Sequence, residues 1–241
     1  MTGKKLKIAL CLSGEPRSSM YCFSYIYEAL LQKNDLYDID VYIHSWKTFR
    51  ALPLYNPKNY QIDSTSEDLI YAKNITKLKK LPENLQLTHE SRYTLPIKNT
   101  ILMYYGIQKS FELTKNEKYD FYIRCRLDVQ FNNQFKLIDI LHQLYNTKSD
   151  IWVKDEYIPS SYKVINDQFA VCNYKAMEVY SNTYSYFSDL IKQTQNFYPE
   201  GLLYEHLKNN NIKVFKGLCD FHLIRKVSPI VFPYTKLVLD E

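Results

Sequence analysis

Residues 119–131 read Tyr-Asp-Phe-Tyr-Ile-Arg-Cys-Arg-Leu-Asp-Val-Gln-Phe, and this stretch decides the fold class. Its apolar, aromatic run at 121–123 leads directly into Arg124, Arg126 and Asp128. A buried strand delivers polar groups to the edge of a sheet in this way, and in open α/β sheets ligands collect at the carboxyl ends of the strands. Two guanidiniums and a carboxylate suit a phosphate there, with or without a metal. The alternative is a strand end that carries a surface salt bridge.

The length and composition of the chain fit one large α/β domain, or one domain with an appendage. There are 241 residues, of which 46% are hydrophobic and 24% charged, as is ordinary for a globular protein with its own core. The net charge of +5 is spread along the chain without a long basic block. It favours an anionic ligand weakly and argues against nucleic acid as a partner.

Cysteines and apolar runs bear on the location of the protein. The five cysteines are isolated, odd in number and mostly inside apolar runs, as expected for buried free thiols in a reducing compartment. The first apolar run, residues 8–12, is too short for a signal peptide, and no run approaches the ~20 residues of a membrane-spanning helix. We therefore expect a soluble, cytoplasmic protein, for which peripheral contact with a membrane is left open.

The first strand is expected at residues 6–12, followed by Ser13, Gly14 and Arg17. Apolar residues recur with helical spacing from about Ser18, so strand, short polar turn and helix open a nucleotide-binding α/β unit. The turn carries one glycine where the dinucleotide fingerprint needs three, which disfavours a Rossmann dehydrogenase. Arg17 lies where a helix N-terminus could share a diphosphate.

A second strand is expected at residues 39–43 and is followed by His44 and Trp46. These two side chains could hold a base or a sugar at the end of the strand. The alternative is a capped, partly buried corner.

The rest of the chain alternates between helical and strand patterns without an internal repeat or a domain boundary. The patterns predict, in chain order, a helix at 67–80, a short strand at 85–89, a long helix from 96 to 111, a helix at 135–145, a short strand at 150–153, a strand at 169–172, a helix at 177–191, a shorter helix from 199 and a last strand at 212–215. The tail around Asp220, His222 and Arg225 reads as irregular.

Further polar groups lie at predicted element ends. Asn166, Asp167 and Gln168 precede a strand, and Glu200 follows Pro199 at the start of a helix. The chain has no Gly-rich phosphate loop ending in Gly-Lys-Ser/Thr, no Gly-x-Ser-x-Gly elbow and no His-Glu-x-x-His helix. The recurrence of polar clusters at strand ends is therefore the informative signal.

The motifs occur in a recognisable order. Ser-Gly-x-x-Arg is followed by Ile-His-Ser-Trp, then by Tyr-Asp-Phe-Tyr-Ile-Arg-Cys-Arg-Leu-Asp, Asn-Asp-Gln-Phe and Pro-Glu-x-Leu-Leu. This order resembles bacterial and large-virus glycosyltransferase-like proteins with the GT-A fold, whose relatives include lipopolysaccharide-synthesis proteins and viral glycan-building transferases. The resemblance spans residues 6–217. It implies one GT-A-like α/β domain over residues 1–241, with a Rossmann-like, mixed, mostly parallel sheet flanked by helices. Its nucleotide-binding part would lie at about 1–130 and its acceptor-side part at about 131–241.

The resemblance implies a metal-assisted glycosyltransferase of hexosyl or deoxyhexosyl type. It would move a sugar from a UDP- or GDP-sugar to a hydroxyl of a glycan or glycolipid. The nucleotide sugar would be bound by Ser13, Gly14, Arg17, His44, Trp46, Arg124, Arg126 and Asp128. The alternatives are a non-catalytic protein that binds nucleotide sugars or carbohydrate, and a sugar nucleotidyltransferase, which usually has a richer glycine-basic loop near its N-terminus.

The metal site implied by the resemblance departs from the family pattern. In GT-A enzymes an Asp-x-Asp holds a divalent metal and the diphosphate; here Asp128 takes the second position and Arg126 the first. With one carboxylate fewer, Mn²⁺ or Mg²⁺ would rely more on diphosphate oxygens, on waters and on His222 or Asp220. The alternative is that Arg126 itself neutralises the phosphate and the metal is weak or dispensable.

The chemistry of sugar transfer asks for two kinds of group. The charge that grows on the leaving nucleoside diphosphate needs preorganised cations, and the attacking hydroxyl needs a carboxylate or histidine within hydrogen-bond reach. Glu200 and Asp167 are the two candidates for this catalytic group; we expect Glu200 to be the base and Asp167 to bind sugar or acceptor hydroxyls. The alternatives are that Glu200 complements a helix dipole and that Asp167 caps a turn.

Overall fold

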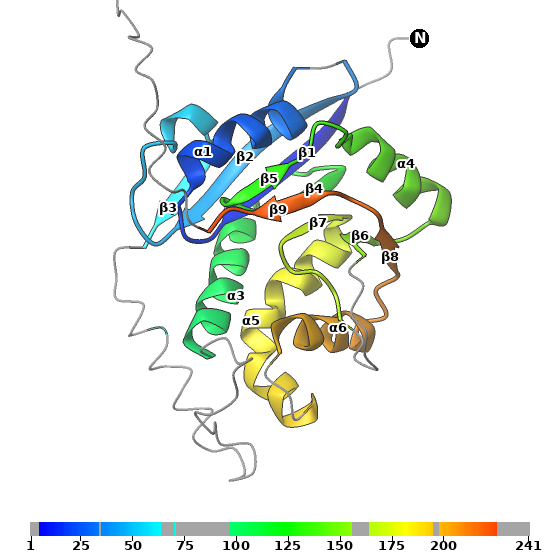
Figure 1. Ribbon diagram of the computed structural model, residues 1–241. Helices are drawn as coiled ribbons and strands as arrows, with labels where there is room; N and C mark the ends of the chain where they lie inside the picture. The colour runs from blue at the N-terminus through cyan, green and yellow to red at the C-terminus, as the bar shows by residue number, and fades with distance from the viewer. Residues whose placement is uncertain are drawn as a thin grey trace, which may run out of the picture.

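The computed structural model describes residues 5–33, 35–63, 70, 97–155, 164–194 and 198–225. Its central sheet has seven strands in the order β3-β2-β1-β4-β7-β6-β8 (Figure 1). They are β1 (Leu6–Ser13), β2 (Tyr37–Ser45), β3 (Asn59–Ile62), β4 (Phe121–Arg126), β6 (Ile151–Lys154), β7 (Phe169–Cys172) and β8 (Val214–Gly217). The first four of these strands are parallel, as are β6 and β8, whereas β7 is antiparallel to both of its neighbours. The predicted α/β class with a mixed, mostly parallel sheet is confirmed.

Helices cover both faces of the sheet, as expected (Figure 1). They are α1 (Ser19–Ile26), which continues into a π-helical turn (Tyr27–Leu31), a 3₁₀ turn (Pro53–Tyr55), α3 (Ile97–Glu112), α4 (Leu137–Thr147), α5 (Tyr174–Thr194) and α6 (Pro199–Asn209). Successive side chains of a strand point to opposite faces. Ile8 and Leu10 of β1 therefore join the core under α1 and α4, while Ala9 and Cys11 join the core with α3, α5 and α6.

A small second sheet corrects the sequence prediction for the tail. Around Asp220, His222 and Arg225 an irregular segment was expected, but β9 (Phe221–Leu223) pairs antiparallel with β5 (Val129–Phe131). The prediction was wrong because two three-residue strands from distant parts of the chain show no local period. The pairing is supported by aromatic packing, since the rings of Phe131 and Phe221 lie 6.0 Å apart and both contact Phe169.

The other predicted elements are confirmed within a few residues where they can be compared. The helix expected at 67–80, apart from Ile70, and the strand expected at 85–89 lie outside the described residues. The described cysteines are free thiols, and all but Cys219 are buried, as predicted. In the described part of the chain, no helix combines the length and the apolar character that crossing a membrane requires.

The direction of β7 is what assembles the site. Because β7 runs antiparallel to β4, its first residue lies beside the last residues of β4, with Phe169 opposite Cys125. Ser13 at the end of β1 is in register with Arg126 at the end of β4. The polar residues before β7 are thereby delivered to the same edge as the carboxyl ends of β1 and β4.

Candidate functional site

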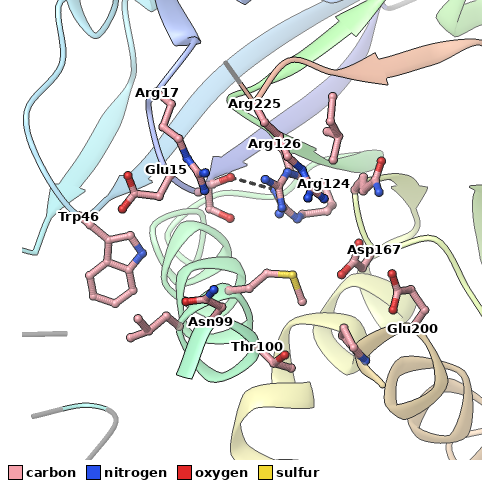
Figure 2. A pocket seen from close by; sticks show the side chains of 17 residues that line it. Glu15, Arg17, Trp46, Asn99, Thr100, Arg124, Arg126, Asp167, Glu200 and Arg225 are labelled. Carbon is pink, nitrogen blue, oxygen red and sulfur yellow. Dashed lines mark hydrogen bonds between the residues drawn. The ribbon is translucent and has the colours of Figure 1, made fainter. Parts of the chain in front are cut away.

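A pocket of about 270 Å³ lies at this edge of the sheet (Figure 2). It is lined by Ser13, Gly14, Glu15, Arg17, Trp46, Asn99, Thr100, Leu102, Met103, Arg124, Arg126, Asp167, Gln168, Pro199, Glu200, Leu223 and Arg225. Most of the residues predicted to bind the nucleotide sugar, and both predicted catalytic carboxylates, are in this set. His44, Asp128 and His222 do not line the pocket.

The turn after β1 forms one wall of the pocket. Gly14 has φ +130°, a conformation that side chains with a Cβ rarely adopt, and a Cβ added there would meet nothing within 4 Å. The turn is tied to the end of β9, because Ser18 Oγ donates a hydrogen bond to the carbonyl of Ile224. This contact places Arg17 and Arg225 at the same side of the pocket, as Figure 2 shows.

Arg124 is a fully buried cation. Its Nη1 donates to the carbonyls of Ser13, at 3.4 Å, and of Cys125, while its Nε has no partner among the described residues. It forms no ion pair with any carboxylate of the described residues. Burial lowers the pKa of Arg124, because a charge removed from water is disfavoured. The position of Arg124 in the pocket wall makes this charge available to an anion.

Arg126 and Asp128 form a bidentate pair. The Nε and Nη2 of Arg126 donate to Oδ1 and Oδ2 of Asp128, both at 2.7 Å. Burial alone would lower the pKa of Arg126, but the hydrogen bonds and charge of Asp128 outweigh it and raise that pKa. Asp128 is 1% exposed and lies behind Arg126, which itself lines the pocket. The guanidinium, not the carboxylate, therefore faces the cavity.

The residues expected to hold a metal are arranged differently from the prediction. Both oxygens of Asp128 accept hydrogen bonds from Arg126. The side chain of His222 is 71% exposed, and its Nε2 lies 3.5 Å from Oδ1 of Asp220, away from the pocket lining. Across the described ranges there is no group of three or more His, Cys, Asp and Glu side chains that could hold a metal. This donor set does not fit a divalent cation.

Two carboxylates lie next to each other in the pocket, beside Arg124 and Arg126 (Figure 2). Asp167 is held by the turn before β7, in which Asn166 Oδ1 accepts hydrogen bonds from the backbone N–H of Gln168 and Phe169. Asn166, rather than Asp167, makes these capping contacts. Glu200 is in the first turn of α6, and its carbonyl accepts a hydrogen bond of 3.1 Å from Ile165 N. The segment before β7 and the start of α6 are thereby fixed to each other.

The histidine and tryptophan after β2 take different positions. His44 is fully buried, and its Nε2 lies 3.1 Å from Oδ2 of Asp63. This is the buried corner that was the alternative for His44. Trp46 does line the pocket, and its ring stacks on Tyr105 with centroids 5.4 Å apart. An aromatic face is thus present at the end of the pocket away from Asp167 and Glu200 (Figure 2).

Some lining residues were not anticipated from the sequence. They are Asn99, Thr100, Leu102, Met103, Leu223 and Arg225. Thr100 is a buried polar residue within the apolar stripe of α3 near its start, and its Oγ1 has no hydrogen-bond partner among the described residues. This polar residue inside an apolar stripe was a signal that the sequence offered. Arg225 had none, because β9 was not recognised.

Comparisons with known proteins give structural similarity without sequence similarity. No protein-family model matches the chain, and no curated protein matches it. The fold is similar to a glycosyltransferase involved in glycosylation of the major capsid of PBCV-1, with 13% identity, 88% of this chain and 82% of that chain covered, and a TM-score of 0.47. Core-mannan synthase A from Aspergillus fumigatus, in an Mn/GDP form, is 10% identical, with 92% of this chain and 75% of that chain covered and a TM-score of 0.49. The galactosyltransferase LgtC in complex with donor and acceptor sugar analogues is 10% identical, with 87% of this chain and 72% of that chain covered and a TM-score of 0.44. Values this low carry no assignment of family or activity.

Proposed function

We propose that this chain is a GT-A-type glycosyltransferase that moves a hexosyl or deoxyhexosyl group from a UDP- or GDP-sugar to a hydroxyl of a glycan or glycolipid. One observation carries the proposal. A single pocket at the carboxyl ends of parallel strands combines four arginines with two neighbouring carboxylates. Arginines suit a diphosphate, and a carboxylate suits the deprotonation of a hydroxyl.

The arginines act on the donor side of the reaction. When the bond between the anomeric carbon and the phosphate oxygen breaks, that oxygen takes the electron pair and the nucleoside diphosphate leaves with increased negative charge. Arg124 and Arg126 are fixed before the reaction begins, one by backbone carbonyls and the other by Asp128. Preorganised cations in a partly buried site stabilise such charge more effectively than mobile ones.

The carboxylates act on the acceptor side. Glu200 removes the proton of the acceptor hydroxyl, whose oxygen forms the new bond to the anomeric carbon. Asp167, next to Glu200, accepts hydrogen bonds from hydroxyls of the sugar or of the acceptor. Trp46 offers an aromatic face for the base or a sugar ring at the far end of the pocket.

The proposal is tested by donor hydrolysis. The purified chain is incubated with a panel of UDP- and GDP-sugars, with Mn²⁺ and in EDTA, and release of UDP or GDP is followed. We expect slow release from one donor class and a loss of about 100-fold or more in Glu200→Gln. Glu178→Gln, which changes an exposed carboxylate on α5 outside the pocket, is the matched control.

The outcomes separate the competing functions. Binding of a nucleotide sugar without release in any condition indicates a non-catalytic binding protein. Formation of a nucleotide sugar from a nucleoside triphosphate and a sugar phosphate indicates a nucleotidyltransferase. If no nucleotide sugar is hydrolysed and none shifts the melting temperature, the proposed function is wrong.

A further inference from the structure

We propose that arginines, in place of a protein-bound divalent metal, hold the diphosphate of the donor. The ligand class is a nucleoside diphosphate bound without metal, and the residues are Arg124 and Arg126 of β4 with Arg17 and Arg225 at the rim of the pocket. This inference rests on the proposed nucleotide-sugar site and adds how its charge is neutralised.

Asp128 already binds a cation, the guanidinium of Arg126. Its two oxygens accept hydrogen bonds of 2.7 Å from Arg126, and its side chain is 1% exposed. A metal bound to Asp128 would have to displace the guanidinium, which would then be a partly buried charge without a partner, close to a second cation. Both effects are unfavourable. Asp128 is therefore a positioning residue that holds the guanidinium of Arg126 in the pocket wall.

Arg124 is a buried positive charge that forms no salt bridge with a described carboxylate. It is fully buried, and among the residues that the structure describes its Nε has no hydrogen-bond partner and its hydrogen bonds go to backbone carbonyls. It makes no salt bridge within the part of the chain that the structure describes. A buried charge without a salt-bridge partner is costly and is typical of a binding site. Asp167 lies near Arg124 and Arg124 has no exposed surface, so Arg124 acts on a bound anion through space and not by direct contact.

Arg17 and Arg225 add two positive charges at one side of the pocket. Arg17 and Arg225 are exposed, and neither forms a salt bridge with a described residue. They come from opposite ends of the chain and are brought to one side of the pocket by the hydrogen bond of Ser18 to the carbonyl of Ile224 (Figure 2). Planar guanidiniums pair with phosphate oxygens through two parallel N–H donors, which a single metal ion cannot do.

The inference is tested by isothermal titration of UDP and GDP into the full chain, in EDTA and in excess Mn²⁺. We expect one of the two nucleotides to bind in EDTA with a Kd within about threefold of its value in Mn²⁺. Arg126→Ala and Arg225→Ala should each weaken binding about tenfold in both buffers, the loss expected for one charge-assisted contact. Arg50→Ala, an exposed arginine outside the pocket lining, should leave the Kd unchanged. Arg225 is exposed, so its variant tests the inference even if changes on β4 disturb folding.

Asp128→Asn provides the decisive contrast. If Asp128 only positions Arg126, its variant weakens binding equally in EDTA and in Mn²⁺. Binding that is seen only with Mn²⁺, and that Asp128→Asn abolishes, overturns the inference while leaving the proposed function standing. If neither nucleotide nor any nucleotide sugar binds in either buffer, the proposed function fails, and this inference fails with it.

Discussion

Arg126 and Asp128 face each other through two hydrogen bonds of 2.7 Å, with side chains that are 17% and 1% exposed. Arg126 is the last residue of β4, and Asp128 follows it by two positions. Leu127 and Asp128 form the turn between β4 and β5 (Val129–Phe131), and in this turn the carboxylate of Asp128 lies against the guanidinium of Arg126. The pair fixes the orientation of the Arg126 guanidinium at the wall of the pocket.

Removal of Asp128 should therefore destabilise the protein. In Asp128→Ala the guanidinium of Arg126 keeps its charge and loses its partner, and breaking a buried pair in this way costs about 3 kcal/mol or more. Urea denaturation at neutral pH measures the change in the free energy of unfolding. The double variant Arg126→Met/Asp128→Leu should recover most of the loss, because no unpaired charge is left. A single variant within about 1 kcal/mol of the wild type would contradict this account.

Asp167 and Glu200 should respond differently to loss of charge. Glu200→Gln is expected to lower kcat by about 10²-fold or more with little change in the KM of the donor, because a general base acts only in the chemical step. Asp167→Asn should mainly raise the KM of the donor or of the acceptor, because it removes a hydrogen bond that is made to the bound substrate before the reaction. Initial rates at varied donor and acceptor concentrations separate the two. The reverse pattern would assign the base to Asp167.

The strand ends could be predicted from the sequence because each follows an apolar run that is long enough to be recognised. β1, β4 and β7 were found in this way; Gly14 follows β1, Arg124 is in β4, and Asp167 precedes β7. The direction of β7 was not predictable, since an apolar run has the same appearance in parallel and antiparallel neighbours. The position of Arg225 depends on β9, whose partner β5 is remote in sequence.

The partner of Asp128 is the second feature that sequence reasoning left open. The spacing Arg126-x-Asp128 is compatible with a carboxylate that binds a metal and with one that binds the guanidinium. Only the side-chain geometry distinguishes them. His44 is a similar case, because a histidine after a strand end serves either a ligand or the core, and here it contacts Asp63.

Gly217 should not tolerate a side chain. A Cβ at this position would lie 2.3 Å from Nε1 of Trp152, whose ring is fully buried and donates to Gln143 Oε1 at 2.7 Å. Gly217→Ala must displace the indole, so we expect a loss of about 1 to 3 kcal/mol in the free energy of unfolding and an altered tryptophan emission. In Gly106→Ala the nearest atom, Nδ1 of His44, is at 3.1 Å, so its loss should be smaller. Equal stability of Gly217→Ala and the wild type would contradict the packing described.

Buried histidines should make the stability fall in mild acid. Burial lowers the pKa of His44, against the opposing effect of Asp63, and burial also lowers the pKa of His206. The unfolded chain binds these protons at about pH 6.5, before the folded chain does, so the free energy of unfolding decreases as the pH falls from about 6.5 toward the folded pKa values. Urea denaturation between about pH 7.5 and 5.5 measures the slope, which cannot exceed about 1.4 kcal/mol per pH unit for each histidine. His44→Gln should reduce that slope. A flat profile in the wild type would show that His44 and His206 titrate alike in the folded and unfolded states.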